Sequence, residues 1–337
     1  MTGSIDAWKL GLLAALAALV SAALIVLLRP YLARYAMAPP NVRSSHKGPT
    51  PQGGGIAVII ATMVGIACAV MLAPELITDH WHLAIMLAAV GALAIVGVTD
   101  DVRPMEALPR LIWQTAAAGV VIAVLPPELH VISWLPWWFE RLCMLIGCVW
   151  FVNVVNFMDG IDWMTVVEVV PITAGLVIFG LMGALPRDAT LVALTLCGAT
   201  IGFAPFNRPV ARLFLGDVGS LPIGLLLSWL LISLAGHGHL TAAVLLPLYY
   251  LGDATITLLR RLVRGDSVMH AHREHYYQRA IDSGASVYQV VGRVFFLNIA
   301  LIGLAFLGLS ASIMFQVTIT FIGIAMVAVL LWSFARQ

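Results

Sequence analysis

Residues 82–101 read HLAIMLAAVGALAIVGVTDD, an apolar run that ends in two adjacent aspartates. A helix that crosses the hydrocarbon core of a membrane needs roughly 20 apolar residues, so this run is long enough to be one. The whole chain has the same character, because 61% of its 337 residues are hydrophobic and 10% are charged. Soluble domains carry about 25% charged residues. The sequence therefore predicts an all-α, polytopic membrane protein.

Hydropathy along the chain predicts about eleven transmembrane helices. The expected spans lie near 8–28, 54–73, 82–99, 109–126, 138–155, 165–184, 188–205, 219–236, 240–260, 289–309 and 312–334. The first run is too long for the core of a signal peptide and lacks a basic leader, so we expect it to be retained. No polar segment is large enough to fold as a soluble domain. We therefore predict a single transmembrane domain over 1–337.

The distribution of basic residues predicts the orientation. With eleven spans, fifteen of the 18 Lys and Arg residues fall on one side, and Lys9, Arg141 and Arg187 remain on the other. Basic loops favour the cytoplasmic side. The N-terminus is therefore expected outside, in the periplasm, and the C-terminus in the cytoplasm.

Five polar segments interrupt the apolar runs, and this orientation places all of them on the cytoplasmic face. They are residues 43–47 with 53–55, 100–101, 156–162, 214–220 and 270–275. Carboxylates beside a membrane span are costly, so such segments usually mark a functional site. We predict that the loops near 29–53, 100–108, 156–164, 206–218 and 261–288 form one active site.

The acidic residues suggest a metal ion. Asp100 and Asp101 repel one another, which raises one pKa or recruits a cation, and oxygen ligands suit Mg²⁺. A solvated helix end is the alternative. Asp217 lies between Gly216 and Gly219 just before an apolar run. It is a candidate for the third corner of a metal–diphosphate site.

A second acidic motif follows the fifth span. Asn156, Asp159 and Asp162 recur every three residues and would share one face if the helix continued through them. The alternative is a polar loop in which Asp162 caps the next helix.

Two basic segments could contact an anionic substrate through multidentate donors. Their candidate side chains are His46, Lys47, His270, His272, Arg273 and His275. The alternatives are a loop that holds anionic lipid headgroups, for 260–280, and simple positive-inside bias, for 46–47.

Taken in order over roughly 40–280, these motifs resemble the polyprenyl-phosphate N-acetylhexosamine-1-phosphate transferases of glycosyltransferase family 4. The matching pieces are Ser45-His46 through Pro49-Thr50-Pro51 to the glycines, Asp100-Asp101, Asn156 through Asp162, Phe214 through Ser220, and the His-rich loop. Eleven spans with an outside N-terminus look more like the WecA branch than the ten-span MraY. The stretch His272-Arg273-Glu274-His275 is similar to the loop of WbpL, an O-antigen-initiating relative.

The resemblance implies a Mg²⁺-dependent phosphoglycosyltransferase of the bacterial inner membrane, with Mn²⁺ as a substitute metal. It would transfer N-acetylamino-sugar-1-phosphate from a UDP-sugar to undecaprenyl phosphate, initiating O-antigen or another cell-envelope polysaccharide and releasing UMP. A homodimer is expected, and no nucleic acid. The implied roles are metal binding for Asp217 and Asp100, catalysis for Asp100, Asp101 and Asp159, and substrate binding for Asn156, Asp162 and the six basic-segment residues.

Two departures from the family pattern affect these expectations. Trp163 stands where the family often has glycine, and its bulk is expected to reshape the nucleotide pocket. The segment after Asp101 lacks the frequent lysine, and Arg103 is expected to replace it. The alternatives are a peptidoglycan-type phospho-MurNAc-pentapeptide transferase and a secondary transporter. A transporter predicts acidic residues near mid-span, and a prenyltransferase predicts two Asp-x-x-x-Asp motifs. Here the acidic motifs cluster at the expected cytoplasmic ends of the spans, and only Asp159 and Asp162 come near the second pattern, with the wrong spacing.

Overall fold

The structure is a computed structural model that describes residues 7–38, 48–72, 74–77, 79–266 and 273–336. Its first half contains α1 (Ala7–Tyr35), β1 (Met37–Ala38), β2 (Thr50–Pro51), α2 (Gly55–Leu72), η1 (Pro74–Leu76), α3 (His80–Val102), α4 (Ala107–Ala123) and α5 (Trp137–Met158). Its second half contains α6 (Met164–Leu181), α7 (Arg187–Asn207), α8 (Asp217–Leu234), η2 (Ala235–His239), α9 (Leu240–Leu245), α10 (Leu248–Arg264), α11 (Tyr276–Asp282), α12 (Val287–Gly308) and α13 (Ile313–Arg336).

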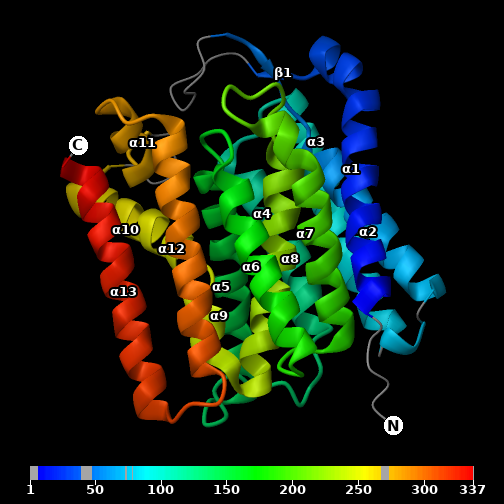
Figure 1. The fold of residues 1–337 in the computed structure, drawn as a ribbon, viewed down its shortest axis with the longest axis vertical. Helices are drawn as coiled ribbons and strands as arrows, with labels where there is room; N and C mark the ends of the chain where they lie inside the picture. Colours follow the sequence, from blue (N-terminus) through cyan, green and yellow to red (C-terminus); the bar gives the residue numbers. More distant parts are fainter. Residues whose placement is uncertain (1–6, 39–47, 73, 78, 267–272, 337) are drawn as a thin grey trace.

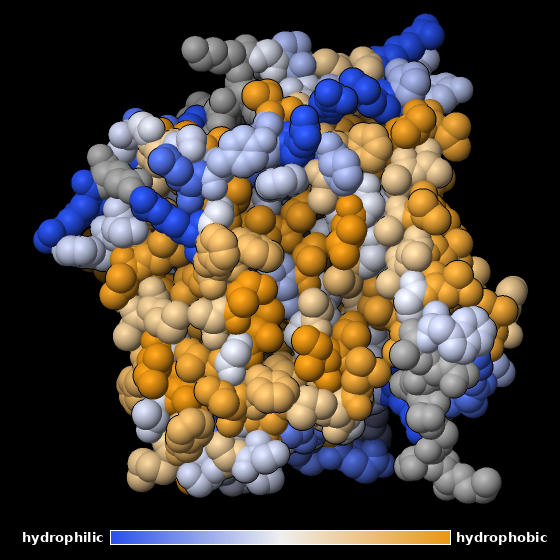
Figure 2. Space-filling view, viewed as in Figure 1, coloured by the Kyte–Doolittle hydropathy of each residue, from blue (hydrophilic) through white to orange (hydrophobic). Residues whose placement is uncertain are grey.

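The long helices stand side by side in one bundle, and α1 starts at the end opposite to the one where α13 finishes (Figure 1). Among the described residues, nine helical segments are long and apolar enough to cross a membrane. The apolar helix α4 is shorter, with 17 residues. Figure 2 shows an apolar band around the middle of the bundle with hydrophilic residues toward its two ends. The prediction of an all-α, polytopic membrane protein is therefore confirmed. The span count and the orientation stay predictions.

The structure differs from the prediction at 240–260, which is not one straight span. Here α8 passes through the turn η2 into the short helix α9, and α10 starts after Pro247. Proline has no backbone N–H and disrupts the turn of helix before it, which explains the break. Beyond the break, α10 is amphipathic, because Asp253 and Arg261 are buried while Leu262 and Val263 are exposed. Average hydropathy over a window cannot detect this division.

The helix at the centre of the bundle is α8. Of its 18 residues 15 are buried, and it packs against α2, α3 and α5. A glycine pair allows the close packing against α2, since a Cβ on Gly55 would lie 2.2 Å from the Cα of Gly219. The peripheral helix α13 buries only a stripe that includes Ile319, Gly323 and Val327. The polar first turn of α8 is therefore held in the best-packed part of the fold.

Connections that are far apart in sequence meet at the first turn of α8. The backbone N–H groups of Gly54 and Gly55 donate to the carbonyls of Phe214 and Leu215, at 2.9 and 2.8 Å. In return, Phe214 donates to Pro51 at 2.8 Å. The short antiparallel pair β1–β2 carries this segment. The glycine-rich motif and the Gly216–Ser220 motif are thus neighbours, as the single-site hypothesis requires.

Candidate active site

Two carboxylates from different helices converge on one guanidinium group. Arg110, in the first turn of α4, contacts Asp100 through its Nη1 at 2.8 Å and Asp217 at 3.5 Å. The other oxygen of Asp100 accepts a hydrogen bond from the backbone N–H of Met105 at 2.6 Å. We call Asp100, Asp101 and Asp217 the carboxylate cluster. Arg110 supplies a cation to two of its members, Asp100 and Asp217.

The expected replacement for the family lysine was Arg103, but the structure puts Arg110 in contact with the cluster. Arg103 is exposed at the C-cap of α3. Only the sequence position of Arg110 hinted at its role, because it is the one basic residue in the apolar stretch 109–126. A charge at the edge of a span is a functional signal. It also fits the positive-inside pattern, and so it was not singled out.

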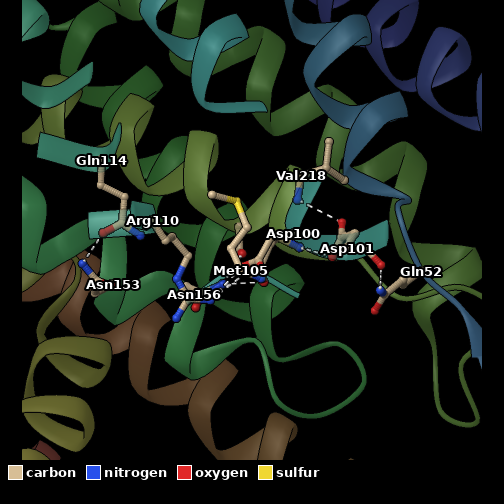
Figure 3. A network of polar contacts seen from close by, with 11 residues as sticks. Gln52, Asp100, Asp101, Met105, Arg110, Gln114, Asn153, Asn156 and Val218 are labelled. Carbon is tan, nitrogen blue, oxygen red and sulfur yellow. Dashed lines mark hydrogen bonds and ion pairs between the residues drawn. The ribbon is translucent and has the colours of Figure 1, made fainter. Parts of the chain in front are cut away.

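Asp101 is turned away from Asp100 (Figure 3). Its two carboxylate oxygens accept hydrogen bonds from the backbone N–H groups of Asp217 and Val218, at 2.9 and 3.1 Å. Its carbonyl accepts a hydrogen bond from the Gln52 side chain at 2.8 Å. Because the first N–H groups of a helix have no partner within the helix, Asp101 supplies a cap to α8 from another helix. Its predicted catalytic role stays a prediction.

The amide of Asn156 holds the other side of Asp217. Its Nδ2 donates to Asp217 Oδ1 at 2.7 Å and to the Ser220 hydroxyl at 2.9 Å. One turn earlier on α5, Asn153 donates to the buried Gln114 at 2.7 Å. Gln114 lies one turn after Arg110 on α4, so a polar row leads from the carboxylate cluster into the bundle (Figure 3). Neither Asn153 nor Gln114 was predicted.

Asp159 and Asp162 lie in the connection from α5 to α6. Because α5 ends at Met158, the three residues of the motif do not share one helical face. Asp159 accepts a hydrogen bond from the Thr165 hydroxyl. Asp162 is buried and accepts one from the backbone N–H of Ala211 at 2.9 Å. Of the three, Asn156 is the residue whose hydrogen bond to the carboxylate cluster is seen directly, through Asp217.

Trp163 has φ of 64°, in the left-handed region that favours glycine. The glycine that the family often has at this position would therefore adopt the backbone without strain. The indole N–H donates to the Ala204 carbonyl at 2.7 Å, and the ring packs edge-on against Tyr288. The side chain thus lies against α7 and α12.

The described part of the His-rich loop is anchored by Asp253, which was not predicted. His46, Lys47, His270 and His272 lie outside the described residues. The buried carboxylate of Asp253 accepts hydrogen bonds from the backbone N–H groups of Tyr276 and Tyr277, at 3.0 and 3.2 Å, and contacts His275 Nδ1 at 3.3 Å.

This anchoring brings α11 to the end of α5. The Tyr277 hydroxyl donates to the Phe157 carbonyl at 3.1 Å, and the His275 ring lies 6.4 Å from the Phe157 ring. Arg273 instead forms an ion pair with Asp282 at 2.7 Å. The structure therefore brings His275 close to the Asn156 motif and ties Arg273 to the far end of α11.

Mg²⁺ fits the donors of the carboxylate cluster when a substrate completes its ligand set. Within the described ranges, no group of three or more His, Cys, Asp or Glu side chains could hold a metal by itself. Mg²⁺ needs only one or two carboxylates together with substrate phosphates. Asp100 and Asp217 supply two, and both already face one positive charge, that of Arg110. They are the residues that would hold the ion.

Comparison with known proteins shows which family and which relatives this chain resembles. The profile of "Glycosyl transferase family 4" matches residues 82–235, which include the carboxylate cluster and the Asn156 motif. Over these residues the chain is similar to this family. A "Probable undecaprenyl-phosphate N-acetylglucosaminyl 1-phosphate transferase" of Bacillus subtilis is 26% identical over 82% of this chain and 80% of its own length.

Two further relatives differ in the product that their names imply. A "Decaprenyl-phosphate N-acetylglucosaminephosphotransferase" of Mycobacterium tuberculosis is 27% identical over 83% of this chain and 76% of its own. A "Phospho-N-acetylmuramoyl-pentapeptide-transferase" of Lactococcus lactis is 27% identical over 64% of this chain and 68% of its own. Relatives named for different sugars therefore match this chain at similar identity.

The pKa of Asp159 predicts how stability changes with pH. Burial raises this pKa from 3.8 to about 7; the Thr165 hydroxyl opposes the rise, and the charges of Asp101 and Asp162 add to it. Between these pKa values the native state holds a proton that the unfolded chain releases. The contribution of Asp159 to the free energy of unfolding is therefore greatest below about pH 4 and is lost as the pH rises through about 7.

Asp159→Asn removes this titration, so the stability difference between wild type and variant should change over that pH range. Thermal unfolding in detergent without divalent cations measures it. Asp266→Asn, which changes an exposed carboxylate of the same end, should follow the wild type. A constant difference for Asp159→Asn would show that its proton is not linked to folding.

Proposed function

We propose that this protein transfers N-acetylamino-sugar-1-phosphate from a UDP-sugar to undecaprenyl phosphate. The observation that carries the proposal is the convergence of Asp100 and Asp217 on Arg110 beside Asn156. This is an arrangement of opposite charges suited to phosphoryl transfer. The names of the Bacillus subtilis and Mycobacterium tuberculosis relatives support the polyprenyl phosphate and the amino sugar.

The reaction joins two anions, so the protein has to position them and offset their charge. An oxygen of the acceptor phosphate attacks the phosphorus that carries the sugar. The bond from that phosphorus to the bridging oxygen breaks, and UMP leaves with the bridging oxygen. Bound Mg²⁺ would neutralise the donor diphosphate. We assign Asp100 and Asp217 to hold it, and Mn²⁺ could take its place.

The other residues of the site act on charge and position. Arg110 can bind a phosphate oxygen when its carboxylate partners turn to a metal ion, because a guanidinium group suits phosphate geometry. Asn156 keeps Asp217 in place through its 2.7 Å hydrogen bond. Asp101 positions the first turn of α8. His275 and Asp162 are proposed to contact the donor through the connections in which they lie.

A peptidoglycan-type phospho-MurNAc-pentapeptide transferase is the second candidate. It is favoured by the match to the Lactococcus lactis relative, which covers 64% of this chain. The relatives named for N-acetylglucosamine match over 82% and 83% of this chain, so the first candidate is supported over more of the sequence. A secondary transporter is disfavoured, since the carboxylate cluster lies at one end of the bundle. We place the enzyme in the bacterial inner membrane, with its site facing the cytoplasm, and propose a homodimer and a role in O-antigen or other cell-envelope polysaccharide synthesis.

A panel of donors tests the proposal. The full-length protein is purified and assayed with Mg²⁺ and undecaprenyl phosphate against UDP-GlcNAc, UDP-GalNAc, UDP-FucNAc, UDP-QuiNAc and UDP-MurNAc-pentapeptide. We expect at least one N-acetylamino-sugar donor to release UMP, and removal of either the acceptor or the metal to stop the release. Release from the pentapeptide donor alone selects the second candidate. If no donor releases UMP, the proposal is wrong.

A further inference from the structure

Arginines gather in a cavity between α10 and α11, apart from the carboxylate cluster. The cavity has a volume of about 240 Å³ and is lined by Thr257, Arg260, Arg264, Glu274 and Arg279. We call it the arginine pocket. Within the described part of the chain, the hydrogen bonds and ion pairs of its side chains run to α10, α11 and their connection. The proposed function assigns no individual role to these five side chains.

Two of the arginines are oriented by a single aromatic ring. The guanidinium groups of Arg260 and Arg279 lie 5.5 and 5.6 Å from the centre of the Tyr276 ring. Arg260 also donates to the Tyr276 hydroxyl at 3.0 Å. At these distances from the ring centre a guanidinium group is attracted to the ring, and those of its planar N–H donors that are not bonded to the hydroxyl stay available to a ligand. The ring thus holds donors at the wall of the cavity.

The pocket carries a net positive charge. Three arginines and one glutamate line it, and the glutamate forms ion pairs with Arg264 and with the neighbouring Arg261. These arginines hold the pKa of Glu274 below its usual value although burial opposes the shift. With Arg261 and Asp266 included, four positive charges face two negative ones. Such a site favours an anion with several acceptor oxygens.

The surface beside the pocket indicates which anion it is. Leu259, Leu262 and Val263 are exposed on α10, and Val263 is 87% exposed. They alternate with the exposed Arg260 and Arg264 along one stretch of helix. Figures 1 and 2 show a hydrophilic projection over this end of α10, directly beside the apolar band. Apolar side chains next to arginines are typical of a helix at a lipid headgroup layer.

We propose that the arginine pocket binds the phosphate of an acidic membrane phospholipid, whose acyl chains lie against Leu259 and Val263. The proposal goes beyond the transfer reaction and does not depend on it. Bound lipid would also fix the position of α11. The Tyr276 ring centre lies 5.5 and 5.6 Å from the guanidinium groups of Arg260 and Arg279, and the next residue, Tyr277, contacts the end of α5 at 3.1 Å. The lipid would thereby support the connection that carries His275.

Native mass spectrometry of the full-length protein tests the proposal directly. Phosphatidylglycerol and phosphatidylcholine are titrated in turn, and bound lipid is counted. The pocket variant is Arg260→Gln with Arg279→Gln. The matched control is Arg29→Gln with Arg34→Gln, which removes the same charge from exposed positions on α1. One arginine at an anionic lipid surface strengthens binding by about fivefold. The pocket variant should therefore bind phosphatidylglycerol roughly 25-fold more weakly than the wild type.

The control variant should retain its phosphatidylglycerol, and phosphatidylcholine should bind weakly to every protein. Equal loss in the two variants, or no loss in the pocket variant, would overturn the proposal. Displacement of phosphatidylglycerol by UDP-GlcNAc would also overturn it, because the pocket would then belong to the donor. If the double variant does not fold, each single variant should still show about a fivefold loss. No step measures UMP, so failure here leaves the proposed reaction untouched.

Discussion

Asp217→Asn is expected to lower the rate of UMP release by about 10³-fold or more. The variant keeps the size of the side chain and can still contact Asn156, but it loses the negative charge that faces Arg110 at 3.5 Å. A neutral amide binds Mg²⁺ poorly and cannot help to place the donor diphosphate. The steady-state rate with the best donor of the panel is the measurement.

The control for this prediction is Asp188→Asn. Asp188 also stands in the first turn of a long buried helix, α7, and lies outside the candidate site. It should keep a rate near that of the wild type, and both variants should elute as folded protein. A wild-type rate for Asp217→Asn would exclude Asp217 from the metal site, and the carboxylate cluster would lose its assigned role.

Gly97→Ala is expected to impair both folding and turnover, although it adds a single methyl group. A Cβ at Gly97 would lie 2.4 Å from the carbonyl oxygen of Asp217 and from the N–H nitrogen of Val218. These are backbone atoms of α8, so they cannot rotate away as a side chain could. Overpacking of this kind costs about 1–3 kcal/mol. The displacement would act on the first turn of α8, and we therefore expect a lower Tm together with a loss of activity of at least about tenfold.

A second glycine of α3 provides the control. A Cβ at Gly91 would meet only the Met63 methyl group, at 3.6 Å, which is ordinary van der Waals contact. Alanine is favoured over glycine within a helix by about 1 kcal/mol, so Gly91→Ala should raise Tm slightly and keep the activity. If Gly97→Ala behaves like Gly91→Ala, α3 and α8 are not packed as closely as the structure shows.

The bundle could be predicted from sequence because each span leaves a signal in its own residues. The run 82–99 corresponds to α3, which covers His80–Val102, and its two terminal aspartates mark where the helix ends. The prediction of one span over 240–260 was wrong, because hydropathy averaged over a window shows neither the break at Pro247 nor the division into a polar and an apolar side. Local composition thus identified the helices, and it missed a change of direction within one of them.

Residues of the candidate site could be predicted where they belong to a polar motif. They were missed where their role depends on a contact between distant segments. The sequence indicated Asp100, Asn156 and Asp217, because each is an oxygen-bearing side chain among apolar residues. Arg110 and Asp253 did not, since their roles depend on which segments α4 and α10 pack against. Trp163 shows a third limit of prediction from sequence, which is the direction of a side chain. That its bulk reshapes the nucleotide pocket stays a prediction, but the hydrogen bond from its indole to the Ala204 carbonyl could not be read from the sequence.

The two hydrogen bonds from α8 to Asp101 fix the site before any substrate arrives. They join the Asp101 carboxylate at the end of α3 to two main-chain N–H groups at the start of α8, at 2.9 and 3.1 Å. The spacing of Asp100 and Asp217 is therefore set by the fold and does not wait for an ion to draw the helices together. Dipoles and charges that are already oriented need little reorganisation when charge moves in a reaction. In this protein the free-energy cost of orienting the Asp100 and Asp217 carboxylates arises during folding and does not recur in each catalytic cycle.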